Sequence, residues 1–566
     1  MAFQISPGVN VAEVDATTVV PSLQTTAGAF AGIFQWGPAD KIKIIDSEIS
    51  LIATFGKPDS SSAESFFTCA NFLSYGNNLS VVRAVGSTAR NAVDGTGESG
   101  SAPSIKNEDV YEATYLRQGN GNGYGPWAAR YTGSLGNSLA VSVCANTSTF
   151  SAWTYKNYFT SAPTTSDYAD SVAGSNDEMH IVVIDENGLF TGSAGTVLET
   201  FAFVSAASDA TINGVTNYYK QVIFNNSKYI YSMDPIDYST TNATWGNTAA
   251  GRRFARPATN ITRSLASGVT GAPADGDIIT SYDLFANKEG IDISLVLTAN
   301  HSVTVQQSVI DNIAIGRADC VAFISPRRAD VVNQSGSEAT NIENWLSSLS
   351  RTSSYVVADS GWKYQFDKYN NTYRWIPLNG DIAGLCVYTD NIRDPWFSPA
   401  GFNRGAIKNS IKLSWNPTKP FRDSLYKLGV NPVVSFPGQG TVLFGDKTLL
   451  DKPSAFDRIN VRRLFITLEK SIAQAAKYSM FELNDEFTRA QFTALVTPFL
   501  RDIQGRRGIT DFKVVCDSTN NTQQVIDSNQ FVGDIYIKPA RSVNYIQLNF
   551  VAIGTGVDFV TIVGAA

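Results

Sequence analysis

The sequence predicts a multidomain protein of mixed α/β and α+β class: a discontinuous α/β core, an inserted β-rich domain and a C-terminal α/β domain, with an extended arm at each end. Three observations support this. The chain has 566 residues, too many for one ordinary hydrophobic core. Strand and helix patterns alternate near both ends of the core. The region between them is poor in charge and rich in small polar residues.

The predicted elements begin after an N-terminal arm at residues 1–21, which follows a Pro7-Gly8 turn signal and lies outside any domain pattern. The first part of the core spans 22–95. Its residues 27–38 read as a buried strand that ends in a turn, and residues 79–86 form a β-branched strand. Between them a helix is predicted, with one side formed by Phe66, Cys69, Ala70 and Leu73.

The inserted domain is expected over residues 96–284. Linker-like composition follows Gly86, and only three charged residues occur from Tyr131 to Ser175. Short strand candidates follow at 179–188 and 198–205. We expect this region on an outer surface.

The core resumes over residues 285–453. Strands are predicted at 292–299, 319–326 and 353–367, with helices at 302–316 and 343–350 between them. This alternation favours a mostly parallel sheet.

The C-terminal domain is expected over 454–540 and starts with a long helix. Its apolar stripe contains Val461, Phe465, Leu468, Ile472 and Ala475. A second helix is expected at 485–504. The final arm, residues 541–566, shows strand periodicity, with Ile546, Leu548 and Phe550 alternating with polar residues.

The bulk composition argues against several classes of protein. The net charge is −7 and the pI is about 5.1, which argues weakly against nucleic-acid binding. The five cysteines are scattered, as expected for buried reduced thiols. The N-terminus shows no signal peptide, and no apolar run is long enough to cross a membrane. We therefore expect synthesis in the cytoplasm and no membrane insertion.

The stretch from Phe436 to Leu450 superficially resembles a phosphate-binding loop. Gly440 and Gly445 have the required separation, but the next position must be lysine and is Asp446. An acidic side chain there would face the phosphate, so a glycine turn that leads into a strand is the preferred interpretation.

No other catalytic or metal pattern is convincing. His180 and His301 are the two histidines, and neither accompanies a nucleophile motif. They are expected to occupy a strand end and a helix start. No zinc ligand set is present. Residues 185–188 resemble half of a calcium loop but lack its remainder, so a turn between strands is expected. No enzymatic activity and no cofactor are predicted.

Several segments, in order along nearly the whole chain, resemble the contractile tail sheath family of long-tailed, T4-like bacteriophages. They include a P-G-V start, the Arg462-Arg463 helix and two motif segments. The motif residues are Pro395, Trp396, Pro399 and Gly401 in the first segment, and Gly438, Gly440 and Gly445 in the second.

This resemblance implies a structural subunit of the virion. Members of the family form hexameric rings stacked around an inner tube and contract to drive that tube through the host envelope, without consuming nucleotide. The implied partners are other copies of the chain, the tail tube protein, and the baseplate and tail terminator proteins, but neither nucleic acid nor membrane.

Two kinds of contact are expected in such an assembly. The terminal arms, with Val9, Val11 and Val14 at one end and Ile546, Leu548 and Phe550 at the other, would add strands to neighbouring subunits. A basic helix face would meet acidic residues of the tube; it contains Arg462, Arg463, Lys470 and Lys477. A solvated helix face is the alternative for these cations.

Two other functions are weighed against a phage sheath. The first is the sheath of an R-type bacteriocin or a secretion machine; such sheaths are usually smaller or split, so the insertion favours a phage. The second is a cytoplasmic α/β hydrolase, which would need one of the two histidines beside a nucleophile.

Overall fold

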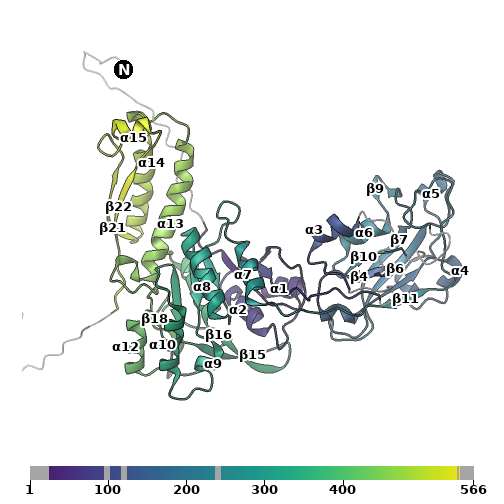
Figure 1. Cartoon of the computed structure of the whole chain (residues 1–566), viewed down its shortest axis with the longest axis horizontal. Coiled ribbons are helices and arrows are strands. Elements are labelled where there is room, and N and C mark those ends of the chain that lie inside the picture. The colour runs from purple at the N-terminus through teal and green to yellow at the C-terminus, as the bar shows by residue number, and fades with distance from the viewer. Residues whose placement is uncertain (1–23, 95–101, 117–123, 236–243, 545–546, 548–566) are drawn as a thin grey trace, which may run out of the picture. The chain divides into compact units, whose positions relative to one another are not determined.

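The computed structural model describes residues 24–94, 102–116, 124–235, 244–544 and 547 (Figure 1). The chain divides into two compact units at the Tyr478–Ser479 boundary. Each unit is described by itself.

A seven-stranded sheet forms the centre of the first unit, and all of its strand pairs are parallel except that of the antiparallel edge strand β2. In order, its strands are β18 (Val430–Asn431), β14 (Val356–Asp359), β13 (Val321–Ile324), β12 (Leu295–Leu297), β1 (Gly28–Gly32), β3 (Leu79–Arg83) and β2 (Lys43–Ile45).

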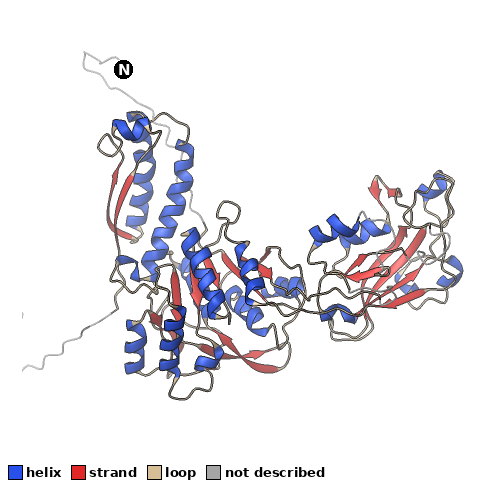
Figure 2. Ribbon diagram, in the orientation of Figure 1, coloured by secondary structure: helices blue, strands red, loops and turns tan. Residues whose placement is uncertain are grey.

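Helices cover both faces of this sheet (Figure 2). Alternate residues of one strand point to opposite faces, so Leu295 and Leu297 join one apolar cluster and Val296 joins the other. The first cluster includes residues of α2 (Ala63–Leu73) and α11 (Asn379–Ile392). The second cluster includes residues of α7 (Asp275–Asp283), α8 (Val303–Ser308) and the π-helix Val309–Ile315. The first unit also contains the helices α1 (Glu48–Phe55), α9 (Arg328–Val331), α10 (Glu338–Leu349) and α12 (Lys419–Lys427).

The predicted α/β core is confirmed, with one strand divided in two. The sequence predicts a single strand over 353–367, but β14 ends at Asp359 and β15 (Trp362–Asp367) begins a separate antiparallel sheet with β16 (Thr372–Pro377) and β17 (Lys412–Leu413). Gly361, at φ +153°, lies at the change of direction, where its N–H donates to the Asp359 carboxylate at 2.9 Å.

The inserted region contains a four-stranded antiparallel sheet, so its β-rich character is confirmed. The strand order is β11 (Ile261–Ser264), β5 (Leu139–Cys144), β6 (Glu178–Asp185) and β7 (Thr196–Ser205). Smaller ladders pair β4 (Trp127–Ala129) with β10 (Ile230–Ser232) and β8 (Thr211–Ile212) with β9 (Val215–Thr216). The α-helices in the described part of this region are short: α3 (Glu108–Tyr111), α4 (Thr147–Phe150), α5 (Asp167–Ser171) and α6 (Tyr219–Asn226).

The end of the insertion differs from the predicted boundary at 284. Helix α7 packs on the core, because Ile278 and Tyr282 belong to the apolar cluster under β1, β3 and α8. The low apolar content of α7 made it resemble the preceding polar region. The chain leaves the core at Gly86 and returns at Gly271, where the Gly86 N–H donates to the Gly271 carbonyl at 3.0 Å.

Two core side chains fix the insertion at this junction. Trp36 is buried and meets the rings of Tyr131 and Phe190 edge-on. The fully buried Arg83 donates to the carbonyls of Thr132 in the insertion and of Phe34, Gln35 and Gly37 in the core. Burial lowers the pKa of Arg83 to about 9.

The long helix α13 (Ile459–Ala476) belongs to the first unit, although the sequence assigns its residues to the C-terminal domain. The second unit contains α14 (Glu486–Gly505), β21 (Ile509–Val515), α15 (Gln523–Asp527) and β22 (Asp534–Pro539). Its two strands form an antiparallel ribbon, and residues of α14 contact β21.

Candidate functional site

The two motif segments recognised in the sequence lie side by side. Strands β19 (Val433–Phe436) and β20 (Gly440–Leu443) make a hairpin. Gly401 donates its N–H to the Leu443 carbonyl at 2.9 Å, and Ile407 donates to Thr441 at 2.9 Å, so the first segment lies along the outer side of β20.

The glycines of the second segment serve the turn of this hairpin. Gly438 and Gly440 have φ of +74° and +79°, which glycine adopts without steric cost. The Gln439 N–H donates to the Phe436 carbonyl at 3.1 Å, and Pro437 precedes Gly438, as in a type II turn. The predicted glycine turn and strand are therefore confirmed.

Residues 445–447 have structural contacts that differ from those of a phosphate-binding loop. Asp446 is buried and accepts from the Arg458 guanidinium at 3.0 Å. The Lys447 ammonium donates to the carbonyl of Tyr426 at 2.7 Å. A β-carbon on Gly445 would lie 2.9 Å from the Asn431 side-chain oxygen, so close packing favours glycine there.

The first motif segment is joined to helix α13. Trp396 is buried, and its carbonyl accepts from the Asn460 side-chain amide at 3.2 Å. Pro399 is buried and Pro395 is half-buried. The motif residues thus link the hairpin to the helix that follows it in the sequence.

Helix α13 lies along the edge of the sheet at which the parallel strands begin. Its Arg463 is buried and donates to both carboxylate oxygens of Asp390 on α11. The same guanidinium donates to the Thr25 carbonyl at 3.4 Å, and the Thr25 hydroxyl donates to Asp390. Burial alone would lower the pKa of Arg463, but the Asp390 charge outweighs it and the pKa is raised.

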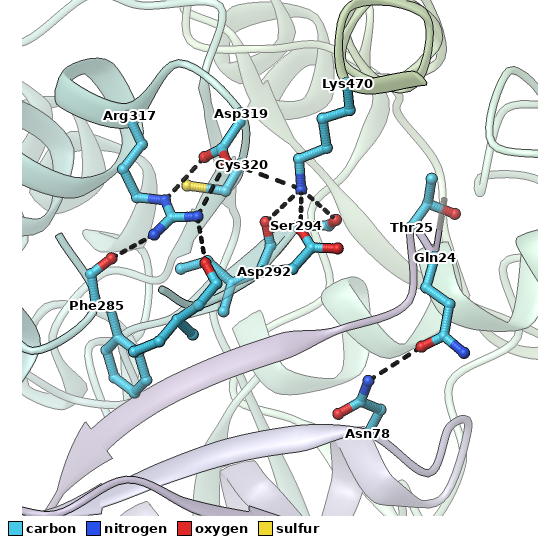
Figure 3. Close-up of polar contacts among 12 residues, drawn as sticks. Gln24, Thr25, Asn78, Phe285, Asp292, Ser294, Arg317, Asp319, Cys320 and Lys470 are labelled. Atoms are coloured by element: carbon cyan, nitrogen blue, oxygen red, sulfur yellow. Dashed lines mark hydrogen bonds and ion pairs between the residues drawn. The ribbon is translucent and has the colours of Figure 1, made fainter. Parts of the chain in front are cut away.

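Lys470 extends from the same helix to residues that precede β12 (Figure 3). Its ammonium donates to the Asp292 carboxylate at 2.7 Å, to the Ile293 carbonyl at 2.7 Å and to the Ser294 hydroxyl at 3.2 Å. The Asp319 carboxylate lies 4.0 Å away and pairs with the buried Arg317 at 2.8 Å.

The structure therefore corrects the predicted basic helix face. Arg463 and Lys470 bind groups of their own chain, and Arg462 is buried with its guanidinium over the rings of Tyr355 and Phe456. Of the four cations, Lys477 remains exposed. The spacing of seven places Arg463 and Lys470 on a common side, but their partners lie 73 and 178 residues away, so the sequence pattern could not reveal them.

These contacts hold the start of β1, from which the N-terminal arm extends. Gln24 accepts from the Asn78 side chain at 3.3 Å beside Thr25 (Figure 3). The arm residues Val9, Val11 and Val14, and Ile546, Leu548 and Phe550 at the other end, lie outside the described residues.

The β21–β22 ribbon has two unoccupied edges among the residues that the structure describes, because these strands pair with each other alone. Its Tyr536 side chain is exposed. Unpaired strand edges readily accept a further strand.

The histidines are structural. The Nε2 atom of His301 lies 2.7 Å from the Ala31 carbonyl, and burial lowers the pKa of His301 to about 4. His180 lies between backbone groups of Ser161 and Phe203 and stacks on Phe159. In the described part of the chain no group of three or more His, Cys, Asp or Glu side chains could hold a metal.

The turn predicted at residues 185–188 is confirmed, with Asp185 as its anchor. Asp185 is buried, and its carboxylate accepts from the Ser138 hydroxyl and from the N–H groups of Phe190 and Thr191. Within the described residues no helix is long and apolar enough to cross a membrane.

Comparison with solved structures shows that this fold occurs in known proteins. The fold matches the sheath tail protein of Listeria innocua with a TM-score of 0.54, at 12% identity over 92% of this chain and 93% of that one. The sheath tail protein of Desulfitobacterium hafniense gives 0.52, at 11% identity over 94% and 100%. The contracted helical sheath of the anti-feeding prophage gives 0.51 at 12% identity, over 97% and 99%.

Comparison of sequences defines the family. Models of the phage tail sheath central and C-terminal domains match residues 287–449 and 451–553. The tail sheath proteins of Vibrio phage KVP40 and Enterobacteria phage T4 are each 32% identical to this chain, over 99% of it and over 100% and 99% of themselves. The chain belongs to the phage tail sheath protein family. It is a structural subunit of a contractile tail sheath and a component of the virion.

Proposed function

We propose that this subunit polymerises as stacked hexameric rings around an inner tail tube and contracts to drive the tube through the host envelope. The full-length identity to tail sheath proteins carries this proposal. The array assembles in the host cytoplasm and ends on the baseplate and the tail terminator. It stores free energy in its assembly, and no catalysis by the chain is involved.

Strand exchange holds the array together in this proposal. Residues 1–21 and 541–566 of one subunit add strands to neighbours, and the open edges of β21 and β22 are suitable acceptors. Each backbone hydrogen bond contributes roughly 1 kcal/mol, so a short strand contributes several kcal/mol while the chain leading to it bends. Arg463 binds the Thr25 carbonyl near the start of β1. Tension on the N-terminal arm therefore acts on the sheet rather than on a loop.

The domains have separate roles in this proposal. The inserted region lies on the outer surface, and the C-terminal domain faces the tube. Because the structure places Arg462, Arg463 and Lys470 against their own chain, Lys477 is the candidate from this set for an acidic residue of the tube.

Deletion of residues 1–20 tests the arm. The deletion leaves Thr25 and its contacts with Arg463 and Asp390 in place, so the chain should remain folded and soluble but unable to polymerise. Electron microscopy and sedimentation of the purified full-length and shortened chains would measure this. Striated tubes formed by the shortened chain would refute arm exchange.

Point variants of the same arm sharpen the test. Replacing Val9 and Val11 with serine should prevent polymerisation, because it removes the apolar side chains that lie on one face of the strand and that a neighbour's sheet would bury. Replacing the polar Asn10 and the small Ala12 with serine is the matched control and should leave polymerisation intact. Equal effects of both changes would contradict a strand with one buried face.

A further inference from the structure

The motif segments present three phenylalanines at the surface. Phe402, Phe436 and Phe444 form a ring cluster with centroids 5.2–6.1 Å apart. Phe402 is 51% exposed and Phe444 is 42% exposed. Exposed single hydrophobic residues are ordinary, but three packed aromatic rings indicate an interaction surface.

Arginines accompany these rings. The Arg422 guanidinium lies 5.8 Å from the centre of the Phe444 ring. Arg404 lies in the same turn as Phe402 and donates to the Ser398 carbonyl at 2.8 Å. Among the described residues, Arg404 and Arg422 donate to the backbone carbonyls of Ser398 and Pro417 and form no ion pair, so both charges are available to an acidic partner. We call Phe402, Phe436, Phe444, Arg404 and Arg422 the aromatic patch.

A second exposed apolar surface has the opposite charge. Between α13 and α14, the acidic segment (residues 480–487) contains Met480, Phe481, Leu483 and Phe487, of which three are more than 70% exposed. It also contains the exposed acids Glu482, Asp485 and Glu486. Phe481 has φ +69°, an unfavourable conformation for an aromatic residue, and its side chain is fully exposed.

We propose that the aromatic patch of one subunit docks on the acidic segment of a second copy. The two surfaces combine apolar centres with charges of opposite sign, which is the composition of complementary halves of one interface. Phe402 and Phe444 in the aromatic patch, and Phe481, Leu483 and Phe487 in the acidic segment, are exposed. A contact between two different surfaces of identical subunits propagates into a ring or a helical filament. This proposal rests on the self-assembly proposed above.

Charge exchange tests the pairing. Arg404→Glu with Arg422→Glu, and separately Glu482→Lys with Glu486→Lys, should each raise the protein concentration needed for polymerisation at least about tenfold. Combining all four changes restores opposite charges and should return that concentration to within about threefold of the unmodified chain. Lys288→Glu, an exposed charge elsewhere, is the control and should have no effect.

Each result of this experiment decides a different point. The pairing is wrong if the chain with all four changes polymerises no better than the two double variants. It is also wrong if the double variants polymerise normally. If they polymerise normally alone but fail to grow on a tail tube, the tube is the partner and the proposal is overturned. Absence of polymers from the unmodified chain would instead refute the proposed function.

Cross-linking provides a test that does not depend on charge reversal. The five natural cysteines are buried, so a bismaleimide should react mainly with introduced ones. Under polymerising conditions, a mixture of Phe402→Cys and Phe481→Cys chains should give covalent dimers, and either chain alone should not. In the control mixture, chains with Ile212→Cys take the place of those with Phe402→Cys; Ile212 is an exposed position in the insertion, so no covalent dimer should form. Equal dimer yields from both mixtures would overturn the proposal.

Discussion

The first unit and the C-terminal unit of this chain differ in the burial of their charged side chains. In the first unit, Arg463, Arg83 and Lys363 are buried and bind carboxylates or carbonyls of the same chain. In the C-terminal unit, the pairs Arg506–Asp502 and Lys538–Asp511 are exposed. The first unit has exposed pairs as well, such as Lys419–Asp423, but it also contains buried cations that maintain its own geometry. In the described C-terminal unit these two pairs and the edges of the β21–β22 ribbon are accessible.

The largest expected effect is the loss of a buried cation. Arg463→Met should cost about 3–5 kcal/mol, because Asp390 would remain buried without its counter-charge. All nine tryptophans precede Tyr478, so urea unfolding followed by tryptophan fluorescence reports the first unit. The matched change Arg506→Met in the exposed pair should alter stability by less than about 0.5 kcal/mol, measured by circular dichroism. Similar losses of stability in the two variants would show that the units do not differ in their dependence on charge.

Acid should destabilise the first unit through His301. Its pKa is about 4 in the folded chain and near 6.5 when unfolded, so the unfolded chain binds the proton first as the pH falls. This group's contribution is complete above pH 6.5 and is lost between there and about pH 4, by up to about 3 kcal/mol. His301→Gln should show a correspondingly smaller loss in urea unfolding between pH 7 and pH 4.5. An unchanged pH dependence would exclude this origin.

A glycine pair separates packing from helix propensity. In α11, a β-carbon on Gly384 would lie 2.4 Å from the Tyr75 ring, so Gly384→Ala should cost about 1–3 kcal/mol despite the better propensity of alanine. At the end of α14 nothing lies within 4 Å of the position, so Gly505→Ala should stabilise by up to about 1 kcal/mol. Thermal unfolding of both variants measures the difference. Destabilisation by both would mean that the end of α14 is also tightly packed.

The smallest effect is expected on the ribbon. Lys538→Ala removes an exposed pair with Asp511 and should change the stability of the isolated subunit by less than about 0.5 kcal/mol. Circular dichroism would measure it, with Arg506→Met as the comparison. A loss above about 1 kcal/mol would show that the ribbon depends on its surface charges as the first unit depends on its buried ones.

Local sequence patterns predicted the helices and strands better than they predicted the contacts between residues far apart in the chain. The apolar run at β1 and the spacing of Val305, Val309 and Ile313 determine burial within a few residues of chain, and all three of these side chains are buried. The division of residues 353–367 into β14 and β15 was missed, because the chain changes direction at Ser360 and Gly361 between two adjacent strand-like runs.

The candidate site was less predictable than the fold for the same reason. The glycine turn was predicted because turn geometry is local. The pairing of Arg463 with Asp390, and the approach of Phe402 to Phe444, depend on the complete fold. The sequence alone made Arg463 and Lys470 look like surface residues, since a cation and its partner carry no shared pattern when they lie far apart.

The junction at Gly86 and Gly271 has a practical consequence. Because the backbone departs and returns at adjacent points, a short turn could replace the whole inserted region without lengthening any core connection. Two core side chains would then lose contacts: Trp36 would lose the Tyr131 ring, and Arg83 would lose the Thr132 carbonyl as an acceptor. Redesign of those two positions would allow unrelated domains to be grafted at this junction while the parallel sheet stays unchanged.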